Sequence, residues 1–443
     1  MERGDLLKSI WTDTIKPIKH EILMGDAKTD VLIIGGGLCG VLCAMFLQEA
    51  GVDYMLVEKD RIGMGITKNT TAKVTAQHGL IYDKLIRTKG VGKAQMYLKA
   101  NEWAVKEYRK RAEHIECDFE NKRSGVYSRT DNDIIEKEIT ALDKIGYSAE
   151  YTNKLNLPFN IKGAVLFEKQ AQFNPLKFIN GITGNLNIKE HTFVNKVKDR
   201  TAYTGRGNIK ADKIIIATHF PFINTRGSYF LKLYQHRSYV IALKGAPDVD
   251  GMFIDENDNG FSFRNYNDML LVGGGGHRTG NSKGKLDKLK DFTNSAYGTA
   301  KQMYLFATQD CMSLDDVAYI GNYSRYTPNW YVASGFNKWG MTSSMVAARL
   351  LCDMVCGKKN ELSELYSPSR SILKTQLLIN GAVSATNLLT PGLKRCPHMG
   401  CKLQWNKAEH TWDCPCHGSR FHEDGRLIDN PAKRDAASVA KNM

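Results

Sequence analysis

Short runs of apolar residues separated by a helical pattern dominate the first part of the chain. Val31-Leu32-Ile33-Ile34 and Tyr54-Met55-Leu56-Val57 have the length and composition of buried strands. Residues 41–50, between them, follow a helical pattern that ends at Gly51. A third buried run, Ile214-Ile215-Ile216, comes much later. Buried strands around a helix predict a parallel sheet.

Other segments show different periods. Two helical faces are predicted, one by Val105, Tyr108, Ala112 and Ile115, the other by Ile135, Ile139 and Leu142. Residues 225–310 read mostly as strands. Asn174-Pro175 predicts a helix start, with the Asn side chain as cap. Residues 372–389 are apolar enough that we expect them to pack against the rest of the chain.

The first strand is followed by a glycine turn. Gly35, Gly37 and Gly40 have G-x-G-x-x-G spacing, and Glu58 closes the second strand at about the required 20 residues. Glycines let the backbone approach a pyrophosphate at a helix N-terminus, and the acid accepts hydrogen bonds from a ribose. The pattern predicts dinucleotide binding without separating FAD from NAD.

Near the end of the chain, two short limbs each offer one Cys and one His. Cys396 and His398 form the first pair, and Cys414 and His417 the second. Two thiolates on one iron and two imidazoles on the other make a Rieske [2Fe–2S] centre. The same four side chains could also hold a structural zinc ion. Zinc leaves the extra cysteine of each limb unexplained.

Cys414-Pro415-Cys416-His417-Gly418-Ser419 closely resembles the second cluster loop of Rieske proteins. The resemblance implies a disulfide between Cys401 and Cys416, and a Ser419 hydroxyl that bonds a cluster sulfide. Two features depart from the family. Asn430-Pro431 stands where many Rieske proteins have Gly-Pro, and too few residues precede Cys396 for the usual base strands. We therefore expect a truncated, small all-β cluster-binding lobe.

The Thr-rich segment 62–78 and the motifs at 315–321 and 332–342 resemble the D-amino-acid-oxidase (DAO) family of FAD-dependent oxidoreductases. A polar loop and a core Trp339 are the plainer interpretations. The resemblance covers roughly residues 30–357 and implies these FAD contacts: Gly35, Gly37, Gly40, Glu58, Lys59, Thr70, Thr71, Lys73, Val194, Ala217, Thr218, Gly335, Trp339, Gly340, Met341 and Thr342.

A run of four glycines, Gly273 to Gly276, precedes His277 and Arg278 and lets another group approach the backbone. A glycine hinge with an exposed basic pair is the alternative. The sequence identifies no general base. Candidate substrate contacts are His78, Arg237, Tyr239, His277 and Arg278.

The expected fold class is α/β (α+β), with a Rossmann-like FAD-binding domain, a mixed-sheet substrate domain and the all-β Rieske lobe. Within a DAO-type unit over 29–360, the FAD-binding parts are about 29–85, 155–222 and 312–357, and the substrate parts about 86–154 and 223–311. An arm (1–28), a linker (361–390) and the lobe (391–443) complete the chain.

Charge and composition limit the partners and the compartment. The formal charge is +14, but Lys and Arg are dispersed, so we expect no nucleic acid and consider an acidic redox protein as acceptor. The apolar run from Val31 to Leu47 is interrupted by four glycines and is too short to favour a transmembrane segment. We see no signal peptide, and six scattered cysteines outside the cluster loops favour a reducing, cytoplasmic location.

Taken with the resemblance, these features predict an enzyme. A small-molecule donor, an amine or amino acid by family analogy, would reduce FAD by hydride transfer, and electrons would pass singly through the Rieske cluster to an external acceptor. Two alternatives remain open at this point. One is an electron-transfer flavo-iron-sulfur protein without its own substrate, and the other is a redox sensor.

Overall fold

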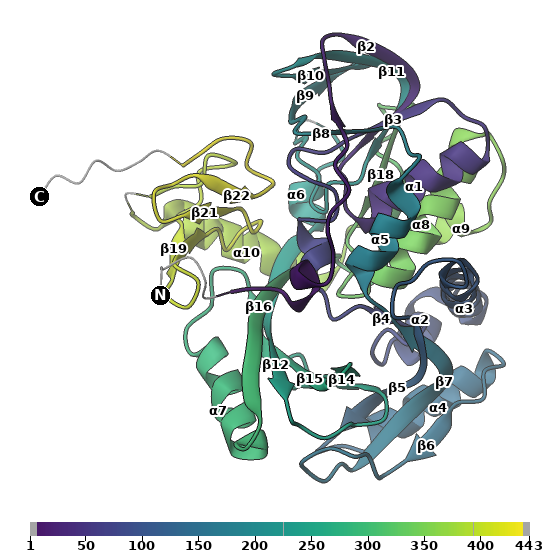
Figure 1. Cartoon of the computed structure of the whole chain (residues 1–443), viewed down its shortest axis with the longest axis vertical. Coiled ribbons are helices and arrows are strands. Elements are labelled where there is room, and N and C mark those ends of the chain that lie inside the picture. The colour runs from purple at the N-terminus through teal and green to yellow at the C-terminus, as the bar shows by residue number, and fades with distance from the viewer. Residues whose placement is uncertain (1–6, 225, 393, 437–443) are drawn as a thin grey trace, which may run out of the picture.

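We analysed a computed structural model of the chain, which describes residues 7–224, 226–392 and 394–436. Two large sheets form the main body, called here the two-sheet body, and a small sheet forms a C-terminal lobe over residues 394–436. In Figure 1 the first large sheet lies at the top, the second at the bottom, and the lobe beside the junction between them.

The first sheet has a parallel centre in which β2 pairs with β3 on one side and β11 on the other. The predicted run Val31–Ile34 is buried within β2, as expected for a strand covered on both faces. The strands run in the order β1 (Glu21–Ile22), β8 (Ile188–Glu190), β3 (Tyr54–Val57), β2 (Ala27–Ile34), β11 (Gly207–Ile216), β10 (Thr201–Thr204) and β9 (Val194–Lys198), and β18 (Trp330–Ser334) pairs β11 and β17 (Tyr319–Asn322).

Helices α1 (Leu38–Glu49) and α8 (Gly340–Val355) pack together beside this sheet. Every residue of α1 from Leu38 to Leu47 is buried, so this helix is central to the largest hydrophobic core. The remaining helices before α10, which is described below, are α2 (Tyr82–Lys89), α3 (Val91–Ala112), α4 (Asp133–Lys144), α5 (Pro175–Thr183), α6 (Tyr229–Lys232), α7 (Lys285–Tyr297), α9 (Leu362–Tyr366) and the 3₁₀ turns η1 (Ile10–Asp13) and η2 (Ile66–Asn69).

The cap of α5 is as predicted. The Asn174 side-chain oxygen accepts hydrogen bonds from the amides of Leu176 and Lys177, and Pro175 occupies the first turn. The two helical faces predicted around Val105 and Ile135 lie in α3 and α4.

The second sheet is mixed and carries the long strands of the substrate region. Its order is β16 (Lys301–Met312), β12 (Tyr234–Lys244), β15 (Met269–Arg278), β14 (Ser262–Tyr266), β13 (Met252–Asp255), β5 (Glu120–Ser128), β7 (Gly163–Gln172) and β4 (Lys73–Val74), with β6 (Glu150–Thr152) on β7. Strands β4 and β7 pair here, although we assigned 29–85 and 155–222 to the FAD-binding part. Their side chains fill the core between the two sheets, which sequence periodicity alone does not allocate.

The lobe contains one small antiparallel sheet. Its strands are β19 (Gln404–Asn406), β20 (Thr411–Asp413), β21 (Arg420–His422) and β22 (Leu427–Asp429). A helix, α10 (Thr375–Leu389), precedes the first cluster loop, and no described residue between α10 and Cys396 belongs to a strand.

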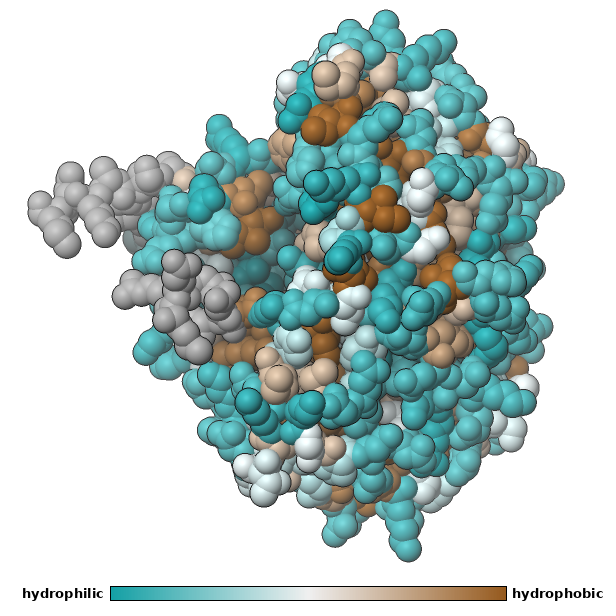
Figure 2. Space-filling view, viewed as in Figure 1, coloured by the Kyte–Doolittle hydropathy of each residue, from teal (hydrophilic) through white to brown (hydrophobic). Residues whose placement is uncertain are grey.

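The expectation that residues 372–389 pack against the rest of the chain holds for one face of α10 only. Asn380 is the one fully buried residue of α10, while Leu378 and Leu389 are 75% and 82% exposed. By contrast, the face drawn in Figure 2 is mostly hydrophilic, with hydrophobic residues in small separate groups. No described helix is both long enough and apolar enough to cross a membrane.

The segment before α10 is fixed to the two-sheet body by Arg370. Its guanidinium forms a bidentate ion pair with Asp315, at 2.7 and 3.0 Å, and stacks over the ring of Tyr319. Lys89 also contacts Asp315 at 2.8 Å. Burial by itself raises the pKa of this carboxyl, but Arg370 and Lys89 bring it down to about 2.

Replacing Arg370 by Ala removes the main partner of a buried carboxylate. We expect the unfolding free energy at pH 7 to fall by about 3 kcal/mol. Because the folded pKa of Asp315 is about 2, below its ordinary value, its contribution is present at neutral pH and is lost as pH falls from about 4 toward 2. Urea unfolding of wild type and variant at pH 7 and at low pH measures both effects. Arg200→Ala, which breaks an exposed pair with Asp212, is the control and changes stability by less than about 1 kcal/mol; an equal loss in both variants contradicts the assignment.

Candidate flavin and cluster sites

The glycine turn between β2 and α1 is held in a strained and crowded geometry. Gly35 has φ of 111°, and a Cβ atom there would lie 2.6 Å from the carbonyl oxygen of Ala217. Glu58 accepts a hydrogen bond of 2.7 Å from the amide of Gly36. Burial raises the pKa of Glu58. The turn therefore brings bare backbone and the predicted ribose acid to the same place.

A cavity of about 430 Å³ opens over this turn. Ten of the predicted FAD contacts line it: Gly35, Gly37, Glu58, Lys59, Thr70, Val194, Ala217, Thr218, Gly340 and Met341. Gly40 lies behind the wall, where a Cβ would fall 1.9 Å from the Gly35 carbonyl oxygen, so its role is close packing of helix on strand. Gly335 and Thr342 are not part of either lining. A cradle of bare backbone beside a carboxylate fits a dinucleotide such as FAD.

A second cavity, of about 400 Å³, continues from the first, and Thr70, Thr308, Asp310, Lys338 and Met341 line both. The predicted residues Thr71, Lys73, His78 and Trp339 line only the second. His78 and Trp339 stack with ring centroids 4.9 Å apart.

His78 is locked into the wall of this cavity. Its ring nitrogens contact the Tyr97 hydroxyl at 2.6 Å and the Thr342 hydroxyl at 2.9 Å. Burial lowers its pKa to about 3, so the ring is neutral at physiological pH. This arrangement makes His78 a rigid neutral wall and a poor proton acceptor.

Two other groups in the cavity have pKa values near neutrality. Burial, assisted by Arg264, lowers the pKa of Lys73 to about 7. Burial raises the pKa of Asp310 to about 6. Both can therefore exchange a proton at ordinary pH. Asp310 was not predicted, because a single Asp inside a strand carries no local motif.

The other four substrate candidates lie outside the second cavity, although Arg237 lines the first. Arg237 is paired with Glu409 of the lobe, and Arg278 donates to the carbonyl oxygens of Pro415 and Cys416. Tyr239 and His277 are buried within the second sheet and lie outside both linings. Of the five candidates, His78 alone lines the second cavity. In the described lining of that cavity there is no arginine.

In the lobe, the two cluster limbs lie next to each other. Cys396 and Cys414 are buried free thiols, and the sulfurs of Cys401 and Cys416 are bonded to each other. Ser419 is fully buried between the limbs and accepts a hydrogen bond from the amide of Ala432.

The two histidines of the limbs present buried nitrogens without partners. The rings of His398 and His417 lie 4.9 Å apart between centroids, and the Nδ1 atom of each has no hydrogen-bond partner among the described residues. Burial lowers their pKa values to about 4 and about 3, so both rings are neutral. Neutral imidazoles with open Nδ1 atoms beside two thiols fit a Rieske cluster, and the separate disulfide accounts for the extra cysteines that zinc leaves unexplained.

Both rings also contact the two-sheet body. His398 Nε2 lies 2.8 Å from the Asn224 side-chain oxygen. His417 lies between the rings of Phe220 and Phe230, each 6.2 Å away between centroids. The imidazole side of the cluster limbs is thus covered by the two-sheet body.

The second cluster loop is held by polar side chains of the second sheet. Gln235 donates to the His417 carbonyl oxygen at 3.2 Å, and Gln309 donates to the Gly418 carbonyl oxygen at 3.0 Å. The Asn430 side chain donates to the carbonyl oxygens of Thr218 and Phe220, at 2.7 and 2.6 Å. The asparagine that departs from the Gly-Pro pattern therefore ties the lobe to the end of β11.

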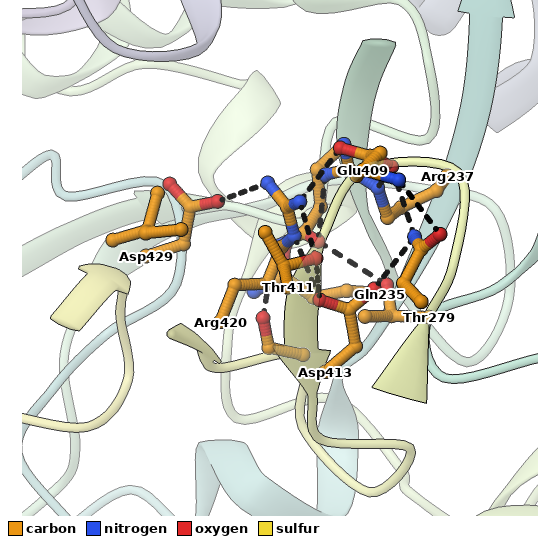
Figure 3. Close-up of polar contacts among 12 residues, drawn as sticks. Gln235, Arg237, Thr279, Glu409, Thr411, Asp413, Arg420 and Asp429 are labelled. Carbon is orange, nitrogen blue, oxygen red and sulfur yellow. Dashed lines mark hydrogen bonds and ion pairs between the residues drawn. The ribbon is translucent and has the colours of Figure 1, made fainter. Parts of the chain in front are cut away.

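A buried ionic network completes this interface (Figure 3). Glu409, on the lobe, lies between the guanidinium groups of Arg237 and Arg420. Arg420 also contacts Asp413 at 3.0 Å and Asp429 at 3.3 Å. Burial by itself raises the pKa of Glu409, but the two arginines bring it down to about 2. The carboxylate is charged at neutral pH, which keeps the arginines together.

Several residues of this interface were not predicted: Asn224, Gln235, Gln309, Glu409, Arg420 and Asn430. Except for Arg420, whose partners are all in the lobe, their partners lie far away in sequence, 172 residues for Glu409 and Arg237. The only available sign was the unusual Asn430, which the sequence analysis noted without assigning a contact.

Comparisons with known proteins agree with both sites. The family model described as FAD dependent oxidoreductase (DAO) matches residues 30–354, and the Rieske [2Fe-2S] domain model matches residues 355–440. The putative Rieske 2Fe-2S iron-sulfur protein YhfW of Bacillus subtilis is 33% identical over 96% of each chain. The cytochrome b6-f complex iron-sulfur subunit of Nostoc punctiforme is 42% identical over 11% of this chain and 27% of its own.

Solved structures share the fold of the two-sheet body. L-proline dehydrogenase from P. horikoshii has a TM-score of 0.66 at 16% identity, covering 78% of this chain and 98% of that one. L-amino acid deaminase from Proteus vulgaris has a TM-score of 0.64 at 13% identity, covering 81% and 100%. The chain belongs to the FAD dependent oxidoreductase (DAO) family, and it binds FAD in its two-sheet body and a [2Fe-2S] cluster in a C-terminal Rieske domain.

Proposed function

We propose that this protein oxidises an amine or amino acid at the second cavity and delivers the electrons singly to an external redox partner. When bound, FAD supplies two-electron hydride chemistry and the Rieske cluster supplies one-electron chemistry. We further propose that Cys396, His398, Cys414 and His417 ligate the cluster. The location we propose is cytoplasmic.

One contact carries the proposal. Gln309 lines the FAD cavity and donates directly to the Gly418 carbonyl oxygen of the second cluster loop. A single side chain therefore separates the FAD cavity from the loop that carries Cys414 and His417. This proximity is what internal electron transfer requires, and neither a separate redox sensor nor an unrelated metal lobe explains it.

The donor class is supported by the cavity and by proteins of the same fold. L-proline dehydrogenase and L-amino acid deaminase act on amino acids, and their fold matches the two-sheet body. An amine must lose a proton before it gives up a hydride. Lys73 and Asp310, with pKa values of about 7 and about 6, are groups in this cavity that can take it.

Anaerobic titration with amines and amino acids tests the donor. We expect one compound to bleach the flavin absorbance and the EPR signal of a reduced cluster to follow. The reduction rate should rise with pH between about 6 and about 7, because Asp310 ionises and Lys73 becomes neutral over that range. Lys73→Gln should remove the upper part of the profile. If no compound bleaches the flavin while dithionite reduces both centres, a partner protein supplies the electrons and the donor assignment is wrong.

Cys396→Ser tests the ligand set. We expect the variant to lack the cluster, with its visible and EPR signals absent, and to keep FAD at the wild-type ratio, because the FAD cavity is built by the two-sheet body. Cys356→Ser changes a half-buried free thiol outside the cluster limbs and serves as control. Loss of FAD together with the cluster in Cys396→Ser contradicts two separable sites.

Glu409→Gln tests whether docking of the lobe matters for internal electron transfer. The change leaves Arg237 and Arg420 facing each other without the charge between them, and we expect it to destabilise docking by about 3 kcal/mol. Stopped-flow spectroscopy should then show unchanged flavin reduction by the donor but slower appearance of the reduced cluster. Glu423→Gln, at an exposed acid of the same lobe, is the control. Equal rates in both variants rule out this docked geometry as the route.

A further inference from the structure

Helix α10 has its polarity reversed relative to a normal surface helix. Its less exposed positions include four polar residues about one helical turn apart, Gln376, Asn380, Ser384 and Asn387, together with the half-buried Leu377 and Val383. Its exposed positions are almost all apolar: Leu378, Ile379, Gly381, Ala382, Ala385, Leu388 and Leu389. A surface helix of a soluble protein buries its apolar stripe and exposes its polar one.

The inward polar stripe is bonded to the protein, so the orientation of the helix is fixed. Asn380 Oδ1 accepts from Arg278 Nη1 at 2.9 Å and from Gln376 at 3.1 Å. The carbonyl oxygen of Asn387 accepts from the amide of Lys402 at 3.0 Å. Rotating the helix to bury its exposed leucines would break its bonds to Arg278 and Lys402. The apolar face therefore points outward as a property of the fold.

The outward face carries no charge but is bordered by cations. Residues 375–389 contain no Asp, Glu, Lys, Arg or His. Lys374 precedes the helix, and Arg395 follows it and bonds the carbonyl oxygens of Leu388, Thr390 and Gly400. In the described part of the chain, neither cation forms an ion pair. An apolar strip with uncompensated positive charge at its ends complements an anionic lipid surface.

The strip also adjoins the first cluster loop. Met399, directly after the cluster residue His398, is itself partly exposed, and Leu388 lies beside Gly400 of the same loop. Leu373, just before the helix, is exposed as well. We call the exposed apolar residues on and next to α10 the α10 face: Leu373, Leu378, Ile379, Leu388, Leu389 and Met399.

We propose that the α10 face binds the surface of an anionic membrane, with α10 lying in the plane of the interface. At about 22 Å, fifteen helical residues are too short to cross the hydrocarbon core but long enough to lie along it. A protein partner is less suited to this face, because half of the helix circumference offers no hydrogen-bonding or charged side chain apart from two threonines. Binding in this orientation places the first cluster loop at the lipid boundary.

The test is sedimentation of the full holoprotein with vesicles. Equal parts phosphatidylglycerol and phosphatidylcholine form the anionic vesicles, and phosphatidylcholine alone forms the neutral ones. We expect wild type to pellet with the anionic vesicles, less with the neutral ones, and less at high salt. Leu378→Glu/Leu389→Glu should lower the partition coefficient roughly a hundredfold, because two leucines no longer insert. Met24→Glu, at a residue 88% exposed and outside the α10 face, should bind as wild type does.

A second measurement avoids the two glutamates of the double variant, which could disturb folding. Leu389→Trp should be quenched by brominated lipid in anionic vesicles, whereas Met24→Trp should not. The proposal is overturned if wild type stays in the supernatant with every vesicle, or if the double variant binds as well as wild type. It is equally overturned if the α10 face instead mediates dimerisation or binds an acidic redox protein while vesicles do not bind. None of these assays uses an electron donor, so they are independent of the proposed oxidation.

Discussion

The position of the Rieske lobe depends on a buried carboxylate held between two arginines. Glu409 is almost inaccessible to solvent, as are Arg237 from the two-sheet body and Arg420 from the lobe. Removing such charges from water is costly, and a hydrophobic contact of equal size could stabilise the docked lobe as well. What the ionic network adds is a unique register, because the forked geometry of an arginine and a carboxylate is satisfied in one arrangement only. With that register set, Gln235 and Gln309 can reach the carbonyl oxygens of the second cluster loop.

This arrangement explains why the lobe can be small. An independent domain needs its own base of strands to cover its core, and here the second sheet and Phe220 and Phe230 cover the imidazole side. The core of the lobe is correspondingly short of apolar residues and consists largely of cysteines with Leu403 and Phe421. The missing base predicted from the sequence is replaced by the two-sheet body.

How much the sequence predicts follows from how far apart the interacting residues are. The glycine turn and the Asn174 cap are local patterns, and their geometry agrees with expectation. The four cluster residues also form a local pattern, and their role as ligands stays a prediction. Arg278 was a substrate candidate because it follows the glycine run 273–276, and Arg237 was named as a further possible contact. The actual partners of Arg237 and Arg278 lie 172 and 137 residues away, which no local pattern encodes. For α10, apolar content predicted packing without saying which face packs. The spacing of Gln376, Asn380 and Asn387 is the sign of the face that does.

The two sides of the cluster limbs therefore meet different surroundings for a physical reason. A permanent contact inside the molecule must fix one geometry, and satisfied buried polar groups do this because any displacement leaves a charge or a hydrogen bond unpaired. The Glu409 network and the hydrogen bonds of Gln235 and Gln309 are contacts of this permanent kind. A reversible contact with something outside the molecule must form without such specificity, and an apolar strip bordered by Lys374 and Arg395 has that character. Asn380 links the internal interface to the outer apolar strip. The same Arg278 that donates to the second cluster loop also donates to Asn380 and so fixes α10 with its leucines outward. The orientation of the outer face is thus set by the interface that positions the cluster limbs.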